Sequence, residues 1–134
     1  MADPAPRHCR CEGSGAAAQA RDELRRFLDE ALLRGHPVPE AVQDAALLVA
    51  SELVTNAVRH ARGSCTMDVG WEGDGIDIGV TDSSPDQPRP RAPDPAGSRG
   101  GWGWPVIQHL TSRVEVRPTD AGGKTVHVHM TAEA

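Results

Sequence analysis

The most informative stretch of this chain is Leu48-Val49-Ala50-Ser51-Glu52-Leu53-Val54-Thr55-Asn56-Ala57-Val58-Arg59-His60-Ala61. At about 100° per residue, it continues one apolar helix face, formed by Val42, Ala45, Ala46, Val49, Leu53 and Ala57. Asn56 falls inside the edge of this face, and Glu52 lies one turn earlier, just beside it. An unpaired buried polar group costs roughly 1–3 kcal/mol, so both side chains need partners. Either a neighbouring strand supplies them, or both side chains face a cleft and hold a ligand.

The segment ELVTNAVRHA, from Glu52 to Ala61, resembles the N-box of the GHKL ATPase superfamily. It is most similar to the N-box of the small, free-standing anti-sigma-factor serine kinases. The resemblance implies that Glu52 polarises the attacking hydroxyl or water and that Asn56 binds Mg²⁺ on the phosphates of ATP. The residue types suit these roles, because an amide carbonyl is a hard oxygen ligand for Mg²⁺. A carboxylate one helical turn away can orient a hydroxyl toward the γ-phosphate.

Length and composition restrict the class of protein. A chain of 134 residues is long enough for one domain with a proper core, which we place at residues 7–134. Residues 1–6 are rich in Pro and Ala and are expected to be disordered. The net charge of −5 argues against a nucleic-acid-binding surface. No apolar run approaches about 18 residues and no signal-peptide core is present, so we expect a cytoplasmic protein without a membrane segment.

The three cysteines do not form a disulfide framework. Cys9 and Cys11 are separated by one residue, and Cys65 is remote from both. A zinc site needs four ligands with recognisable spacing, and His127 and His129 could in principle complete one. Because the spacing signature is missing, we expect reduced thiols without a functional role.

Hydrophobic periodicity predicts the elements along the chain. Helices are expected at 16–34, 40–61 and 104–112, and strands at 7–13, 65–71, 76–81, 113–118 and 124–131. The segment 83–101 is rich in Pro, Ser, Asp and Gly and is too long for a plain connection, so we expect a lid-like loop. This order predicts an α/β two-layer sandwich, with three helices on one face of a mixed, mostly antiparallel sheet. It matches the Bergerat ATP-binding fold that the resemblance implies.

Asp82 comes directly after the strand predicted at 76–81 and is a candidate base-binding residue. The resemblance implies that its carboxylate accepts the amino group of adenine, whereas the carbonyl oxygen of guanine would be repelled. The alternative is an Asp that caps a turn before Ser83 and Ser84, which is common. The sequence departs here from the D-x-G-x-G pattern of the superfamily, because neither expected Gly is present.

The segment GSRGGWG, residues 97–103, precedes the third predicted helix and resembles the second glycine box and ATP lid. The backbone amides of Gly100, Gly101 and Gly103, together with the helix start, suit a phosphate. Trp102 stands where the superfamily usually has Arg, and Arg99 could replace that cationic contact. The alternative is a flexible Gly/Ser linker.

Thr125 follows Gly122-Gly123-Lys124, which imitates the end of a Walker A loop. We reject that motif, because Pro118 stands where its first Gly should be and a strand follows instead of a helix. The resemblance implies that Thr125 lies near the adenine. An ordinary strand Thr after a hairpin turn is the alternative.

These observations predict an ATP- and Mg²⁺-binding regulator that acts as a serine protein kinase and anti-sigma factor. Its expected partners are a sigma factor and a small anti-anti-sigma protein of the STAS type, and a homodimer is compatible with the resemblance. The main alternative is a catalytically weak ATP-binding interaction module, which the altered glycine loops favour. A detached histidine-kinase catalytic domain is a weaker interpretation, because no phospho-acceptor helix is present.

Overall fold

The computed structural model describes residues 2–60, 63–84 and 103–132. The helices are α1 (Ala16–Leu33), α2 (Glu40–His60) and α3 (Gly103–Leu110), with a short 3-10 helix, η1 (Gly13–Gly15). The strands are β1 (Arg7–Glu12), β2 (Ser64–Glu72), β3 (Gly75–Asp82), β4 (Arg113–Pro118) and β5 (Lys124–Thr131). Each helix and strand expected from the sequence is present, and its ends lie within two residues of the predicted ones. Residues 2–6 lack regular secondary structure, and Pro4 among them is buried.

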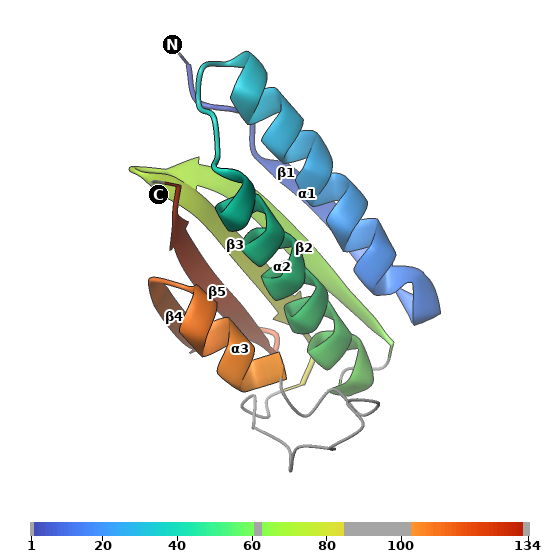
Figure 1. Ribbon diagram of the computed structural model, residues 1–134. Coiled ribbons are helices and arrows are strands. Elements are labelled where there is room, and N and C mark those ends of the chain that lie inside the picture. The colour runs from blue at the N-terminus through green and yellow to red at the C-terminus, as the bar shows by residue number, and fades with distance from the viewer. Residues whose placement is uncertain (1, 61–62, 85–102, 133–134) are drawn as a thin grey trace, which may run out of the picture.

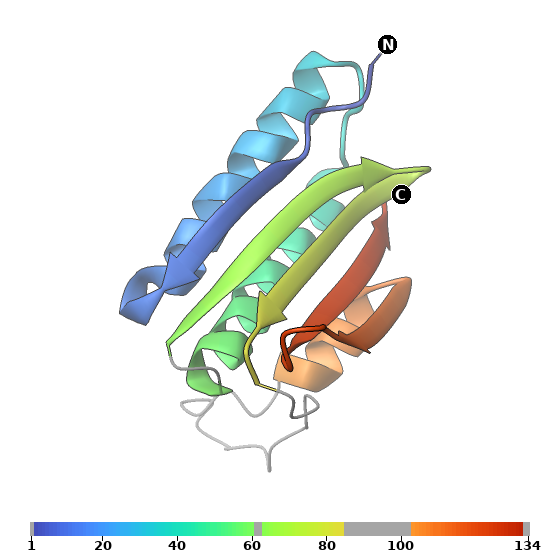
Figure 2. The same ribbon diagram turned by 180° about the vertical axis from the view of Figure 1, so that it is seen from behind.

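The architecture is a two-layer sandwich, with one five-stranded sheet and all three long helices on one of its faces (Figures 1 and 2). The strand order is β1-β2-β3-β5-β4, and all four pairings are antiparallel. The expectation of a mixed sheet is therefore corrected for the described strands. β3 and β4 run in the same direction, but the β4–β5 hairpin places β5 between them.

The core lies between the helices and the sheet. Its largest fully buried side chains include Phe27 and Leu24 of α1, Met67 of β2 and Ile78 of β3. Among the described residues, α2 is the one helix long and apolar enough to cross a membrane, judged by length and composition alone. A core helix meets the same criteria, and the predicted apolar face of α2 is indeed packed in this core.

A Schellman motif ends α1 and directs the chain into α2. Gly35 has φ 83° and donates its N–H to Leu32, while the N–H of His36 reaches the carbonyl of Ala31 at 2.8 Å. The imidazole of His36 then packs against Trp71, with ring centroids 4.8 Å apart. The antiparallel helix pair is thereby fixed over the sheet, and α2 crosses its middle (Figure 1).

Several elements begin or end at one end of the molecule. α2 and β3 end there, while α3 and β5 begin there (Figures 1 and 2). The last turns of α2 carry Glu52 and Asn56, and the last residue of β3 is Asp82. The predicted site residues of α2 and β3 therefore lie toward the same end of the sandwich.

Candidate functional site

Glu52 and Asn56 lie on the same side of α2, one turn apart, and both are half-buried. Their neighbours Leu53 and Ala57 are buried in the core. Within the part of the chain that the structure describes, neither side chain makes a hydrogen bond or ion pair. By contrast, the hydroxyl of Ser51 accepts a hydrogen bond from Arg21 of α1 at 3.0 Å. No neighbouring described strand satisfies the polar pair, so this arrangement favours the interpretation in which both groups face a ligand.

Asp82 forms a buried ion pair with Lys124, the first residue of β5. The Nζ atom of Lys124 lies 3.0 Å from Oδ2 and 3.1 Å from Oδ1 of Asp82, and also donates to the carbonyl of Ser84 at 3.2 Å. The N–H of Ser84 donates to Oδ1 of Asp82 at 2.8 Å. The side chains of Asp82 and Lys124 are only 2% and 7% exposed. Asp82 therefore caps the turn through the N–H of Ser84, as the alternative interpretation expected, and its carboxylate is also paired with the internal cation Lys124.

Gly123 allows the close approach that this ion pair requires. A Cβ atom on Gly123 would lie 1.9 Å from the carbonyl oxygen of Asp82 and 2.9 Å from the Cα of Ser83. These are backbone atoms, which cannot move aside as a flexible side chain could. Gly123 is therefore needed where β5 begins beside the end of β3.

The predicted phosphate-binding glycines are only partly within the described chain. Gly100 and Gly101 lie outside the described residues, as do Arg99 and Trp102. Gly103 is the first residue of α3, so its position at a helix start agrees with the prediction.

Known proteins resemble this chain over most of its length. Residues 14–130 match the histidine kinase-like ATPase domain family. The chain belongs to this family. The anti-sigma F factor of Pasteuria penetrans is 34% identical over 105 residues, which cover 69% of this chain and 69% of that protein. The crystal structure of the RsbU and RsbW domains of Rv1364c from Mycobacterium tuberculosis superimposes with a TM-score of 0.68 at 22% identity. That match covers 95% of this chain and 32% of the longer one, and it establishes the fold.

The structure of this histidine kinase-like ATPase domain does not bring Thr125 to Asp82. Thr125 pairs with Thr81 across the β3–β5 ladder, and their hydroxyl oxygens lie 2.8 Å apart. Successive side chains of a strand point to opposite faces, so Thr125 faces away from the helices, whereas Lys124 and Val126 face toward them. Lys124, which the sequence interpretation did not assign, holds the place beside Asp82. The sequence did contain a signal for this position: Lys124 is two and four residues before the apolar Val126 and Val128, so its side chain points to the same face of the strand.

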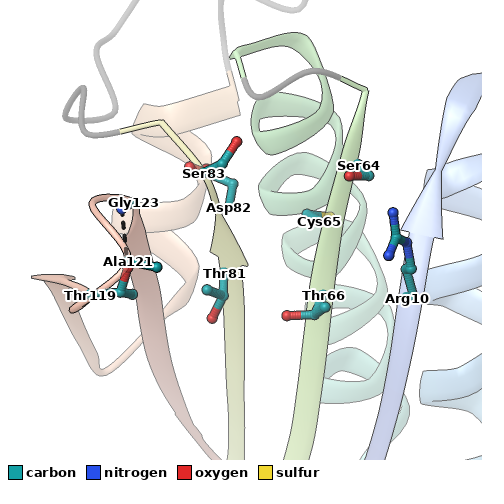
Figure 3. Close-up of a pocket in the computed structure, with 10 residues that line it drawn as sticks. All are labelled: Arg10, Ser64, Cys65, Thr66, Thr81, Asp82, Ser83, Thr119, Ala121 and Gly123. Atoms are coloured by element: carbon teal, nitrogen blue, oxygen red, sulfur yellow. Dashed lines mark hydrogen bonds between the residues drawn. The ribbon is translucent and has the colours of Figure 1, made fainter.

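One pocket of about 260 Å³ lies at the strand ends, and Figure 3 shows its lining. Arg10, Thr66 and Thr81 contribute to it, and strand pairing places these three side chains in one row on the helix-free face. Asp82 and Gly123 at the strand ends line the pocket as well, whereas Glu52 and Asn56 do not. Because the polar pair of α2 is not part of its lining, we do not assign the phosphates of the nucleotide to this pocket.

The potential zinc ligands are separated by the sheet. Cys9 and Cys11 face the helices, with their sulfur atoms 3.1 Å apart, whereas His127 and His129 are on the helix-free face. Burial, followed by the hydrogen bond to Cys11, raises the pKa of Cys9 to about 12, and burial raises that of Cys65 to about 11. Thiols with such pKa values are poor nucleophiles at neutral pH.

Proposed function

We propose that this chain is an ATP-binding regulator that phosphorylates a serine of a small antagonist protein and holds a sigma factor. Membership of the histidine kinase-like ATPase domain family supports the binding of ATP, and the 34% identity to an anti-sigma F factor supports the regulatory role. The observation that carries the proposal is the pair Glu52 and Asn56, which is half-buried on a core helix without partners in the described chain. We expect the protein to switch between its sigma factor and its antagonist partner in the cytoplasm.

The residues on α2 suit the proposed roles by their chemistry. The amide oxygen of Asn56 makes no hydrogen bond to the described chain, so it is available to Mg²⁺ on the triphosphate. Glu52, one turn earlier, would orient the serine hydroxyl of the antagonist and accept its proton. Bound ATP would supply the phosphoryl group. Asp82 would recognise the adenine amino group, although in the described arrangement its carboxylate is held by Lys124.

Phosphoryl transfer by a Glu52→Gln variant tests the proposed kinase role. We expect transfer to a serine-bearing antagonist of the STAS type to fall by about 10²–10⁴-fold, as is typical when a general base is lost. ATP affinity should be retained, because the negative charge of Glu52 repels the triphosphate and its removal therefore does not weaken binding. The matched control is Asp44→Asn on the exposed side of α2, which should transfer phosphate at the wild-type rate.

Melting temperature and ATP affinity are measured on the same variants. Combined loss of stability, affinity and transfer in Glu52→Gln would mean that Glu52 has only a structural role. A wild-type protein that binds ATP but transfers no phosphate would instead favour the interaction-module alternative. The occupied carboxylate of Asp82 is the structural observation that favours this alternative.

A further inference from the structure

Lys124 occupies the carboxylate of Asp82, which the adenine base of a nucleotide would need as its hydrogen-bond acceptor. Its ammonium spans both carboxylate oxygens of Asp82, and it also binds the carbonyl of Ser84. With the N–H of Ser84 added, Oδ1 of Asp82 already accepts two hydrogen bonds. Because the side chain of Asp82 is 2% exposed, an incoming donor cannot reach the remaining lone pairs while Lys124 is in place.

We propose that Lys124 is the specificity-determining residue of the base site, because it competes with the nucleotide base for Asp82. This inference rests on the proposed ATP-binding function. While the ion pair is closed, a nucleotide is held by contacts to its phosphates, which are the same in ATP and GTP. When the pair opens, Asp82 can accept the adenine amino group and repel the guanine carbonyl oxygen. Wild-type protein therefore binds ATP weakly and distinguishes it poorly from GTP.

Charge alone predicts the opposite effect of removing Lys124. A nucleotide triphosphate is an anion, so loss of a nearby cation ordinarily weakens its binding. Competition for Asp82 predicts tighter binding, because the apparent dissociation constant equals the intrinsic one divided by the fraction of protein in the open state. The sign of the change thus separates the two effects.

The test compares wild type, Lys124→Gln and Arg10→Gln by calorimetry with Mg·ATP and Mg·GTP. Gln at position 124 keeps a neutral donor for Asp82. Arg10 is an exposed cation in the same pocket lining, and its ion pair is with Glu12 and not with Asp82. For Lys124→Gln we expect ATP to bind roughly tenfold more tightly, with a similar gain in preference over GTP. Arg10→Gln should leave ATP affinity unchanged or weaken it. The double variant Asp82→Asn/Lys124→Gln should lose the gained preference.

Each outcome decides the inference. If the wild-type affinity for ATP is measurable and Lys124→Gln binds ATP equally tightly or more weakly, the inference is overturned. The proposed function then still stands. Equal tightening in Arg10→Gln also overturns the inference, because the effect would then be general electrostatics. If neither wild type nor Lys124→Gln binds ATP, both the inference and the proposed function fail. Binding by Lys124→Gln alone supports both.

A measurement on the wild-type protein covers the case in which Lys124→Gln does not fold. A buried, ion-paired ammonium exchanges its protons slowly, so the ¹⁵N-labelled side chain of Lys124 should give an NMR signal without nucleotide. Saturating Mg·ATP should shift or remove this signal as the ion pair opens. A signal that is unchanged at saturation overturns the inference.

Discussion

Lys124 and Thr125 are neighbours in sequence but face opposite sides of the sheet. Strand parity places Lys124 beside Asp82 in the buried layer and Thr125 beside Thr81 on the helix-free face. At the residue scale, this parity decides which side chains can act together. Because a shift of one position along a strand changes the face, Lys124 and Thr125 cannot contribute side chains to a site on the same face.

Gly123 provides a residue-scale prediction about the strand end. Gly123→Ala should lower the free energy of unfolding by about 1–3 kcal/mol or more, because its Cβ would overlap the Asp82 backbone. Urea denaturation measures this difference. Gly70→Ala on β2 is the matched control, since its Cβ would meet no atom within 4 Å, and we expect a change within about 0.5 kcal/mol. Equal effects of the two substitutions would contradict the close approach at Gly123.

At the element scale, periodicity and turn residues were sufficient to place the helices and strands. α1 ends where Gly35 permits a positive φ, and the β2–β3 turn falls at Gly73, where φ is 59°. The order of the strands in the sheet could not be predicted from the sequence, because the position of β5 between β3 and β4 depends on long-range pairing. The pairing of Asp82 with Lys124 depends on that same register and was therefore missed, whereas the Glu52 and Asn56 pair lies within one helix and was visible locally.

The helix-free face of the sheet carries a histidine whose stability contribution depends on pH. His129 binds Asp77 through Nδ1 at 2.6 Å and Asp74 through Nε2 at 2.9 Å. Burial lowers the pKa of His129, but the hydrogen bonds to Asp77 and Asp74 outweigh burial, so the pKa lies above its usual value. For Asp77, burial raises the pKa, while hydrogen bonds from Glu72 and His129 lower it further than burial raises it.

These shifts predict a stability window on the acidic side of neutrality. A raised His pKa stabilises the fold below the unfolded value of about 6.5 and loses this contribution as pH rises through the folded pKa. A lowered Asp pKa stabilises above about 4 and loses its contribution as pH falls through the folded pKa. The joint contribution should therefore be greatest between about pH 4 and 6.5.

Thermal unfolding of His129→Gln at acidic and alkaline pH tests this window. The variant should lose about 1–3 kcal/mol near pH 5.5, where the wild-type imidazolium is paired with Asp77 and Asp74, and clearly less near pH 8.5, where less of the wild-type imidazole is charged. His8→Gln serves as the control, because His8 is 62% exposed in its pair with Asp68 on the same face. An equal loss at both pH values for His129→Gln would contradict the assigned pKa direction.

On the scale of the whole molecule, the sandwich brings distant segments to one end. The last turns of α2, the end of β3 and the starts of α3 and β5 meet there (Figure 1). The polar pair of α2 is thus held at the edge of the helix face that is buried in the core. A rigid core helix keeps side chains in place at lower entropic cost than a loop would.

Binding of Mg·ATP to wild type and Asn56→Ala, measured by calorimetry, tests the central claim most directly. Asn56 is half-buried and makes no hydrogen bond to the described chain, so its removal should spare the fold while taking an oxygen ligand from the metal. Asp44→Ala, on the exposed side of α2, is the control and should bind as wild type does. We predict that wild type binds and that Asn56→Ala loses about tenfold or more in affinity, as for a lost metal-site partner. Equal affinity of wild type and Asn56→Ala, with both folded, would contradict the assigned site.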